Sequence, residues 1–98
     1  MEIRRTQAYD KWFSALHDQT ARARIATRIR RLQNGNPGDS KSVGAGVIEL
    51  RIDYGPGYRV YYIKRGNVLI LLLCGGDKSS QSDDIKKAKA LAQSEKEM

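Results

Sequence analysis

The longest apolar run of the chain, residues 68–74, constrains the fold more than any other feature. Its seven residues are far fewer than the roughly 18 that a membrane-spanning helix needs, so we expect no transmembrane segment. The run lies between the turn-forming residues 65–67 and 75–76, and it has the length of a strand. A strand that is apolar at every position is covered on both faces. The run therefore predicts the central strand of a sheet with helices on both sides.

The first third of the chain has the periodicity of helices. Two apolar helical faces are predicted, one formed by Tyr9, Trp12, Phe13 and Leu16 and the other by Ile25, Ile29 and Leu32. Asp18 can accept hydrogen bonds from the free N–H groups at the start of the second helix, and residues 34–35 end that helix. We expect the two helices to form a hairpin. Residues 2–6 are a candidate for a short edge strand.

Beyond the Gly- and Pro-containing segment 34–39, the spacing of apolar residues changes from 3.6 to 2. Apolar and polar residues alternate in residues 47–53, which predicts a strand with one buried face. Residues 53–57 are rich in residues that favour turns, and we expect residues 58–64 to form the next strand. The strand at 68–74 completes an antiparallel meander.

A final helix is predicted after residue 79. Ser80 or Ser82 can cap it, and the inward positions are Ile85, Ala88 and Leu91 or Ala92. The fold class is therefore α+β: an antiparallel meander with an N-terminal helical hairpin on one face and a C-terminal helix on the other, as one domain over residues 1–98.

The chain has a formal charge of +7, and the excess is confined to its middle. Residues 22–78 hold eleven basic and four acidic residues, whereas the two ends are balanced. Such an excess suits a surface that binds nucleic acid, although a basic balance can also serve solubility alone.

Cys74 and His17 are the single cysteine and histidine, so no thiolate cluster or histidine pair is available. We expect neither a metal ion nor a cofactor.

Two arginines are predicted to meet on the sheet. If Ile52 lies opposite Tyr58, then Arg51 faces Arg59 on one side of the sheet. Like charges directly opposite each other are destabilising, so the pair needs a carboxylate or an anionic ligand, and Glu49 is the only carboxylate on that face of the two strands. Two alternatives remain: a diagonal Glu49–Arg59 ion pair with Arg51 solvated, or a one-residue register shift that separates the arginines.

Further side chains can join this pair. Lys78 follows the apolar strand in a loop that can carry its ammonium group over the polar face, or it is simply solvated. Tyr61 is expected on the face of Arg51 and Arg59, where its ring can stack on a base. Three arginines of the second helix lie at helical spacing along one flank of its apolar stripe. They can contact the phosphates of RNA or an acidic partner, or can cover core edges with their aliphatic stems. They are Arg24, Arg28 and Arg31.

Five ordered segments of the chain resemble the addiction-module killer proteins, the HigB-like members of the RelE/ParE toxin superfamily. They are ARARI (21–25), GNPGDSK (35–41), GVIELRI (46–52), GPGYRVYY (55–62) and LLLCGGDK (71–78). The likeness spans about residues 8–92. It implies the RelE-like fold and a bacterial or phage toxin that cleaves messenger RNA on the ribosome. It also implies a tightly bound antitoxin, commonly a HigA-like one with a helix-turn-helix domain. Because no apolar segment follows the charged N-terminal residues, we expect no signal peptide and a cytoplasmic protein.

The resemblance assigns roles to individual residues. Arg59 matches the strand arginine that acts on the scissile phosphate, Arg51 the basic position of the preceding strand, and Lys78 a second cation. The chain departs from the best-known RelE pattern by having Glu49 with Arg51 in place of a lysine pair, and residues 83–85 where a catalytic tyrosine is expected. Glu49 is our candidate for proton abstraction, although two nearby arginines lower the pKa of a carboxyl and make it a weak base. We also expect Lys41 to contact RNA.

The reaction that we expect is metal-independent attack of a ribose 2'-hydroxyl on its adjacent phosphate, with cations stabilising the charge that develops. Lys78 can protonate the leaving oxygen. Two other functions stay open. One is a basic module that binds nucleic acid without chemistry, and the other is a ParE-like inhibitor that acts on a topoisomerase through a protein interface.

Overall fold

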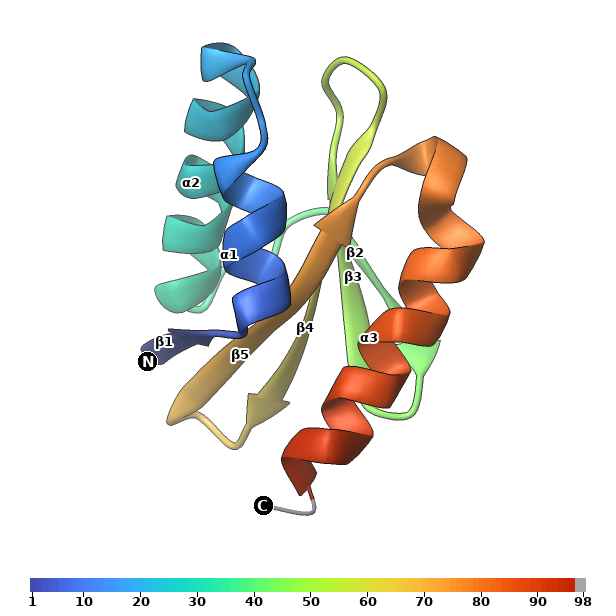
Figure 1. The fold of residues 1–98 in the computed structure, drawn as a ribbon. Coiled ribbons are helices and arrows are strands. Elements are labelled where there is room, and N and C mark those ends of the chain that lie inside the picture. The colour runs from blue at the N-terminus through green and yellow to red at the C-terminus, as the bar shows by residue number, and fades with distance from the viewer. Residues whose placement is uncertain (97–98) are drawn as a thin grey trace.

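The computed structural model describes residues 1–96 as an α+β fold with one sheet between helices (Figure 1). Its elements are β1 (Glu2–Arg5), α1 (Gln7–Ser14), α2 (Gln19–Gln33), β2 (Ser40–Gly44), β3 (Val47–Ile52), β4 (Tyr58–Arg65), β5 (Leu69–Gly76), a 3-10 turn (Lys78–Ser80) and α3 (Gln81–Lys96). The strands lie in the order β1-β5-β4-β3-β2. Helices α1 and α2 cover one face of the sheet and α3 covers the other, which confirms the predicted layers.

The sheet is mixed, and this corrects the predicted antiparallel meander. Strands β2 to β5 are antiparallel to their neighbours, but β1 pairs with β5 in parallel, from Glu2 opposite Leu69 to Arg5 opposite Leu72. The edge strand predicted near the N-terminus is therefore present. Because β1 occupies the edge, β4 is the middle strand instead of the apolar β5. Strand β5 still has a neighbour on each side, as a continuous apolar run requires.

Strand β2 was not predicted. Its sequence is Ser-Lys-Ser-Val-Gly, in which a single large apolar residue marks no alternation. The strand forms because its backbone pairs with β3, from Ser40 opposite Leu50 to Gly44 opposite Val47. The connection to β3 needs backbone in the left-handed region, which Gly44 and Gly46 supply with φ values of 97° and 78°.

The predicted N-terminal helical hairpin is present, but α1 ends at Ser14, so Leu16 lies beyond the helix in the connection to α2. Asp18 caps α2 by accepting hydrogen bonds from two backbone N–H groups of its first turn. Thr6 caps α1 by accepting a hydrogen bond from the Tyr9 N–H, and its hydroxyl also donates to the Leu73 carbonyl at 2.5 Å. Helix α2 ends at Asn34 and Gly35, and Gly35 adopts a φ of 91°. Both helices are thus fixed at their starts by short polar side chains.

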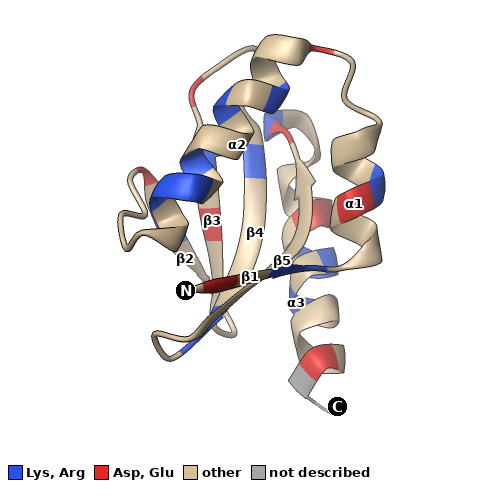
Figure 2. Cartoon of the chain, turned by 90° about the vertical axis from the view of Figure 1, so that its left-hand side faces the viewer, with Lys and Arg blue, Asp and Glu red and all other residues tan. Residues whose placement is uncertain are grey.

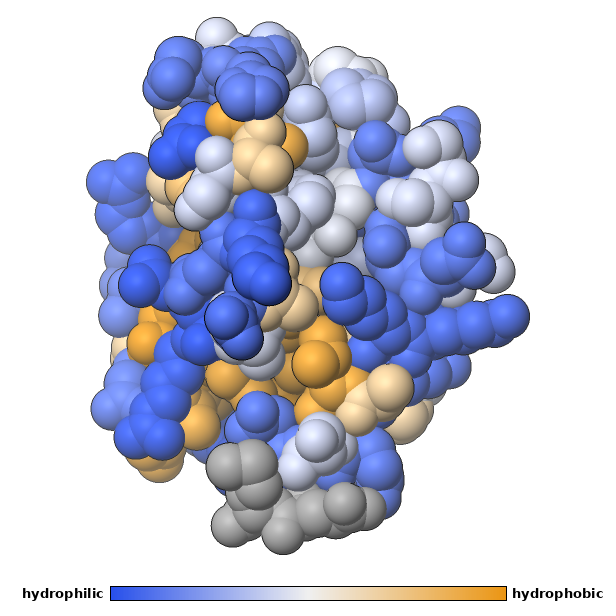
Figure 3. Space-filling view, viewed as in Figure 1, coloured by the Kyte–Doolittle hydropathy of each residue, from blue (hydrophilic) through white to orange (hydrophobic). Residues whose placement is uncertain are grey.

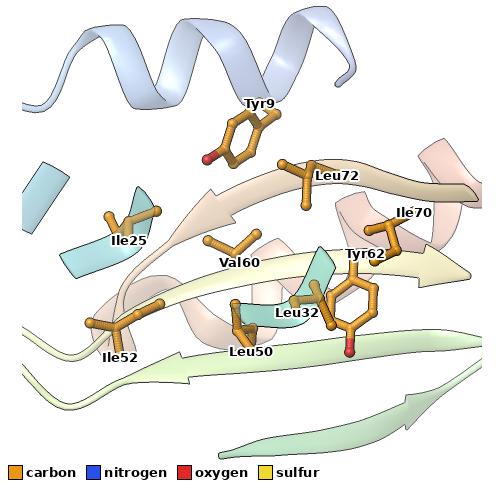
Figure 4. Packing of buried hydrophobic residues seen from close by; sticks show 9 residues of the cluster. All are labelled: Tyr9, Ile25, Leu32, Leu50, Ile52, Val60, Tyr62, Ile70 and Leu72. Atoms are coloured by element: carbon orange, nitrogen blue, oxygen red, sulfur yellow. The ribbon is translucent and has the colours of Figure 1, made fainter. Parts of the chain in front are cut away.

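The apolar faces of the hairpin pack against β3, β4 and β5 (Figure 4). The buried residues of this cluster are Tyr9, Ile25, Leu32, Leu50, Ile52, Val60, Tyr62, Ile70 and Leu72. Trp12, Phe13, Leu16 and Ile29 are partly buried against them. Burying one such aliphatic side chain contributes about 1.5–3 kcal/mol. This cluster supplies much of the apolar burial that holds β3 and β4 in place.

A second cluster lies between the sheet and α3. Its buried residues are Val47, Tyr61, Ile63, Leu71, Leu73, Cys74, Ala88 and Ala92. The prediction that Ala88 and Ala92 face inward is confirmed, while Ile85 and Leu91 pack at the edge of the cluster.

Hydrophobic surface remains visible between α1 and α3 (Figure 3). No helix within residues 1–96 combines the length and the apolarity that crossing a bilayer requires.

The start of α3 differs from the prediction. Asp77 caps the 3-10 turn by accepting a hydrogen bond from the Ser79 N–H, and the Ser80 hydroxyl accepts one from the Asp77 N–H. Asp77 thus caps the 3-10 turn ahead of α3, while Ser80 directly precedes α3 and Ser82 lies within its first turn. The turn begins at Lys78, with only Asp77 between it and the end of β5, and leads into α3 without a loop.

Gly75 and Gly76 belong to β5, although the sequence indicated that they end it. A Cβ atom at Gly75 would collide with the ring of Trp12, and one at Gly76 would collide with the carboxylate of Asp84. The two glycines therefore let α1 and α3 approach the strand closely from opposite faces.

We predict that Gly75→Ala lowers the free energy of unfolding by about 1–3 kcal/mol, because the added methyl group overlaps the Trp12 ring. Urea denaturation measures the loss. The matched control is the same change in a Trp12→Ala background, where the space is free and the added cost should nearly vanish. An equal cost in both backgrounds would contradict this explanation.

Candidate functional site: a pocket of cations around a buried carboxylate

Arg51 on β3 and Arg59 on β4 lie directly opposite each other. The register also places Ile52 opposite Tyr58, which confirms the predicted pairing, so the one-residue shift that would separate the arginines does not occur. The next pair along the same face joins Glu49 to Tyr61, and Tyr61 packs under α3. The arginines therefore lie on the α3 face, at the end of the sheet next to the β3–β4 loop.

The carboxylate of Glu49 joins the two arginines. Glu49 is completely buried, and its Oε1 accepts hydrogen bonds from Arg51 Nε and Arg59 Nη1, each at 3.1 Å. Its Oε2 accepts from the Tyr61 hydroxyl at 3.0 Å and from the Gln81 side-chain amide at 2.9 Å. We call these five residues the Glu49 network. The Glu49–Arg59 ion pair is thus present, and Arg51 joins it instead of being solvated alone.

These contacts determine the protonation of the network. Burial raises the pKa of the Glu49 carboxyl, but the hydrogen bonds from Gln81, Arg51 and Tyr61 and the charge of Arg59 outweigh burial, so the pKa lies below its ordinary value. The carboxylate therefore stays ionised at neutral pH. Burial and the hydrogen bond to Glu49 raise the pKa of Tyr61, so its hydroxyl remains a donor.

Arg51, Arg59 and Lys78 line one pocket of about 430 Å³, which we call the cation pocket. The remaining lining residues come from the β3–β4 loop, its flanks and the chain ahead of β2: Asp39, Ile52, Asp53, Gly55, Pro56, Gly57 and Tyr58. The backbone N–H of Lys78 lies 3.4 Å from the Pro56 carbonyl, a contact that holds the 3-10 turn against the loop. The three cations that the sequence singled out therefore share one hollow.

The arginines keep hydrogen-bond donors that the protein does not use. The side chain of Arg51 is 36% exposed and that of Arg59 is 13% exposed. Arg59 Nε is buried, and it has no hydrogen-bond partner among the described residues. Asp39 and Asp53 also line the pocket, yet within residues 1–96 neither forms an ion pair with the three cations. The exposed parts of the two guanidinium groups suit phosphate or carboxylate oxygens, whereas the buried Nε of Arg59 is not accessible to a ligand.

A second hollow of about 570 Å³, which we call the α2 groove, runs along α2. It is lined by Gln19, Thr20, Ala23, Arg24, Thr27, Arg28, Arg31, Ile52 and Asp53. The last two residues also line the cation pocket, so the two hollows adjoin. Figure 2 shows basic residues repeated along the face of α2 that this view presents.

The arginines of α2 have different surroundings. Arg28 donates to three backbone carbonyls, those of Arg51 at 2.5 Å, Pro37 at 3.2 Å and Asp39 at 3.1 Å. It thereby ties the chain ahead of β2 to the backbone of a pocket arginine. The guanidinium group of Arg24 lies 4.8 Å from the ring centroid of Tyr54. Arg31 is exposed along the groove.

Tyr61 does not occupy the position that base stacking requires. It lies on the predicted face, but α3 covers it completely, so its ring is not available to a nucleotide. Glu49 is also absent from the lining of the cation pocket, and both of its oxygens are already hydrogen-bonded. This geometry is unfavourable to the predicted proton abstraction by Glu49. Lys41 is exposed on β2, opposite Glu49, and lies outside the pocket lining.

Sequence reasoning missed Gln81. Polar residues at the start of a helix are usually read as capping residues, and no spacing links position 81 to position 49. The available signal was chemical: a carboxylate on a covered sheet face needs donors for both oxygens.

Within residues 1–96 no three His, Cys, Asp or Glu side chains are placed to hold a metal ion. Burial raises the pKa of Cys74 to about 11, so its thiol is protonated at neutral pH.

We predict that Glu49→Gln destabilises the protein by about 3–5 kcal/mol at neutral pH, because two guanidinium groups lose their buried counter-ion. In the wild type, the lowered pKa of Glu49 contributes stability above the ordinary pKa of glutamate, and this contribution is lost as the pH falls through the folded-state value. The difference between variant and wild type should therefore shrink in acid. Urea denaturation over a pH series measures it.

The matched control for this experiment is Glu2→Gln, which removes an exposed carboxylate paired with Arg4. Its effect should stay below about 1 kcal/mol at every pH. A difference between Glu49→Gln and wild type that does not change with pH would contradict the ionised state that we assign to Glu49.

Comparison with known proteins shows the family to which the chain belongs. The family model described as "Phage derived protein Gp49-like (DUF891)" matches residues 11–97. A protein of Haemophilus influenzae, itself described as uncharacterized, is 56% identical over 93 residues, which cover 95% of this chain and 94% of that protein. No solved structure matches the chain significantly. The chain thus belongs to the Gp49-like family of phage-derived proteins, a toxin-like family related to the RelE/ParE-type toxins.

Proposed function

We propose that this chain is the HigB-like toxin of a type II toxin–antitoxin system and that it cleaves messenger RNA on the ribosome. The observation that supports this function is the pocket in which Arg51, Arg59 and Lys78 lie together beside a buried carboxylate. A phosphodiester offers one negative charge and several acceptor oxygens, which complement guanidinium and ammonium donors. The relation of the family to RelE/ParE-type toxins supports the toxin assignment.

In the proposed reaction, the 2'-oxygen of a ribose forms a bond to the adjacent phosphorus and the bond from phosphorus to the 5'-oxygen breaks. The products are a 2',3'-cyclic phosphate and a free 5'-hydroxyl. Arg51 and Arg59 bind the non-bridging oxygens and stabilise the negative charge that develops on them. Lys78 protonates the leaving 5'-oxygen, and the proton of the 2'-hydroxyl passes to water. The mechanism uses no metal ion or cofactor.

Glu49 has a positioning role in this mechanism. It is buried, it does not line the cation pocket, and its lowered pKa makes it a weak base. Its charge offsets one of the two guanidinium charges, and the hydrogen bonds to Oε1 hold both groups on one side of the sheet. Asp39 and Asp53 also line the pocket, so together with Glu49 the carboxylates equal the three cations in number. The phosphate would therefore be bound by the exposed guanidinium and ammonium donors, which form no ion pair with Asp39 or Asp53.

The α2 groove is the proposed path of the RNA next to the scissile phosphate, because it adjoins the cation pocket. Arg24 and Arg31 would contact phosphates along this path, and Lys41 would contact RNA from β2. Arg28 is already bonded to three carbonyls, so its main role is to hold the loop ahead of β2 in place. The pocket offers Lys78 as an acid but no strong general base. This suits an enzyme that relies on the ribosome to position its substrate.

The proposed partners follow from this function. The ribosome and messenger RNA are the targets, which places the activity in the cytoplasm. A cognate antitoxin, of the HigA-like type with a helix-turn-helix domain, would silence the toxin in unstressed cells.

We predict that Arg59→Ala lowers the rate of messenger RNA cleavage by about 10²–10³-fold, because one donor to the developing charge is lost. Growth arrest on expression of the protein should disappear with it. Primer extension on translated transcripts measures the cuts. The matched control is Lys64→Ala, which removes an exposed cation from the same strand, near its opposite end, and should leave the cuts unchanged.

The outcomes separate the competing functions. Discrete cuts by the wild type, lost in Arg59→Ala and kept in Lys64→Ala, support the proposal. Growth arrest by the wild type without cuts would contradict it and favour either a binding module or a topoisomerase inhibitor. Cuts that persist in Arg59→Ala would show that cleavage does not depend on the arginine pair.

A further inference from the structure

The two oxygens of the Glu49 carboxylate have different kinds of partner. Oε1 accepts hydrogen bonds from the two arginines of the cation pocket, whereas Oε2 accepts from the Tyr61 hydroxyl and the Gln81 amide. Oε1 therefore contacts the arginines that line the cation pocket, and Oε2 contacts residues that do not line it. This division suggests that the donors to Oε2 influence the arginines indirectly.

The orientation of a glutamate carboxylate depends on its partners, because its terminal torsion is broad and roughly two-fold. If only Oε1 were bonded, the group could rotate and present either oxygen to Arg51 or Arg59. Donors on Oε2 remove this freedom. With Oε1 fixed, the positions of Arg51 Nε and Arg59 Nη1 are fixed as well, since both lie 3.1 Å from it.

Gln81 is the more informative of the two donors. Tyr61 lies on the same strand as Arg59 and is buried in the α3-side cluster, so it has a packing role in any case. Gln81 begins α3 and lies 32 positions from Glu49 in the sequence. It does not line the cation pocket, so it would not contact a ligand bound there. The side chain of Gln81 is connected to Arg51 and Arg59 through Glu49, whereas its backbone ends the 3-10 turn that carries Lys78. Measurements on the two arginines therefore report the effect that passes through Glu49.

We propose that Gln81 is a positioning residue that acts through Glu49 to hold Arg51 and Arg59 at the separation needed to bind one phosphate. The start of α3 is thereby part of the site, although no residue of α3 lines the cation pocket. The catalytic consequence rests on the proposed function. The effect on the arginine side chains does not, and it can be measured without substrate.

A purely local role for Gln81 makes the opposite prediction for one substitution. Residues at a helix start interact with the positive end of the helix dipole, where an acidic side chain is favourable. If Gln81 served only α3, Gln81→Glu would be neutral or stabilising. If Gln81 orients Glu49, the same change puts a second carboxylate where Oε2 now has a donor at 2.9 Å, and it is more harmful than Gln81→Ala.

The test compares Gln81→Ala and Gln81→Glu with Gln7→Ala as the matched control. Gln7 is the first residue of α1 and is exposed, so the control makes the same change at an equivalent helix position. The first measurement is the Nε–H NMR resonances of Arg51 and Arg59 in the free protein. The second is the rate of messenger RNA cleavage on saturating programmed ribosomes.

We expect both arginine resonances to shift or broaden in the two Gln81 variants and to stay unchanged in Gln7→Ala. We expect cleavage to fall about tenfold in Gln81→Ala and further in Gln81→Glu, because a small displacement of a catalytic group is costly. If a Gln81 variant does not fold, Tyr61→Phe replaces it, since loss of the hydroxyl frees the same oxygen and should alter the same resonances.

Unchanged arginine resonances in the folded variants would overturn the proposal, whatever the cleavage activity. Equal cleavage by Gln81→Glu and wild type would also overturn it. If the wild type itself cleaves no messenger RNA, the proposed function fails, and the resonances alone decide whether Gln81 positions the arginines.

Discussion

A buried carboxylate between two opposing arginines is the interaction on which this end of the sheet depends. Arg51 and Arg59 face each other across β3 and β4, which would be destabilising for two like charges alone. Glu49 would be equally unfavourable as an isolated buried charge. Together they satisfy each other, yet a buried ion pair seldom stabilises a fold more than apolar packing would. Its value here lies in the cations that it leaves oriented toward the pocket.

Both helical layers contribute to this arrangement. On one face, Arg28 of α2 bonds to the backbone carbonyl of Arg51 and to the chain ahead of β2. On the other face, the first residue of α3 bonds to the oxygen of Glu49 that the arginines do not use. The 3-10 turn between β5 and α3 brings Lys78 to the same pocket. The three cations, from β3, β4 and the 3-10 turn, are therefore held by contacts from α2 and α3 on opposite faces of the sheet.

The parts of this site that follow from the sequence are those governed by periodicity. The alternation in β3 and the assumed length of the loop after it predicted Arg51 opposite Arg59, and the structure has this register. A shift of one residue stayed open from the sequence, and the observed pairing excludes it. Periodicity says nothing about β2, which has one large apolar residue, or about the parallel pairing of β1. It also assigns Tyr61 to the correct face without revealing that α3 covers that residue. The contact of Gln81 with Glu49 depends on where α3 packs, which no local pattern encodes.

The most direct test of this account is a crystal structure of the protein bound to a short RNA whose ribose 2'-hydroxyls are methylated, so that no cleavage occurs. The account predicts one phosphate in the cation pocket, within hydrogen-bond distance of both Arg51 and Arg59, with the ammonium group of Lys78 close to the 5'-oxygen of the same phosphate. RNA bound elsewhere on the protein, with the arginine pair unoccupied or its guanidinium groups turned apart, would contradict it.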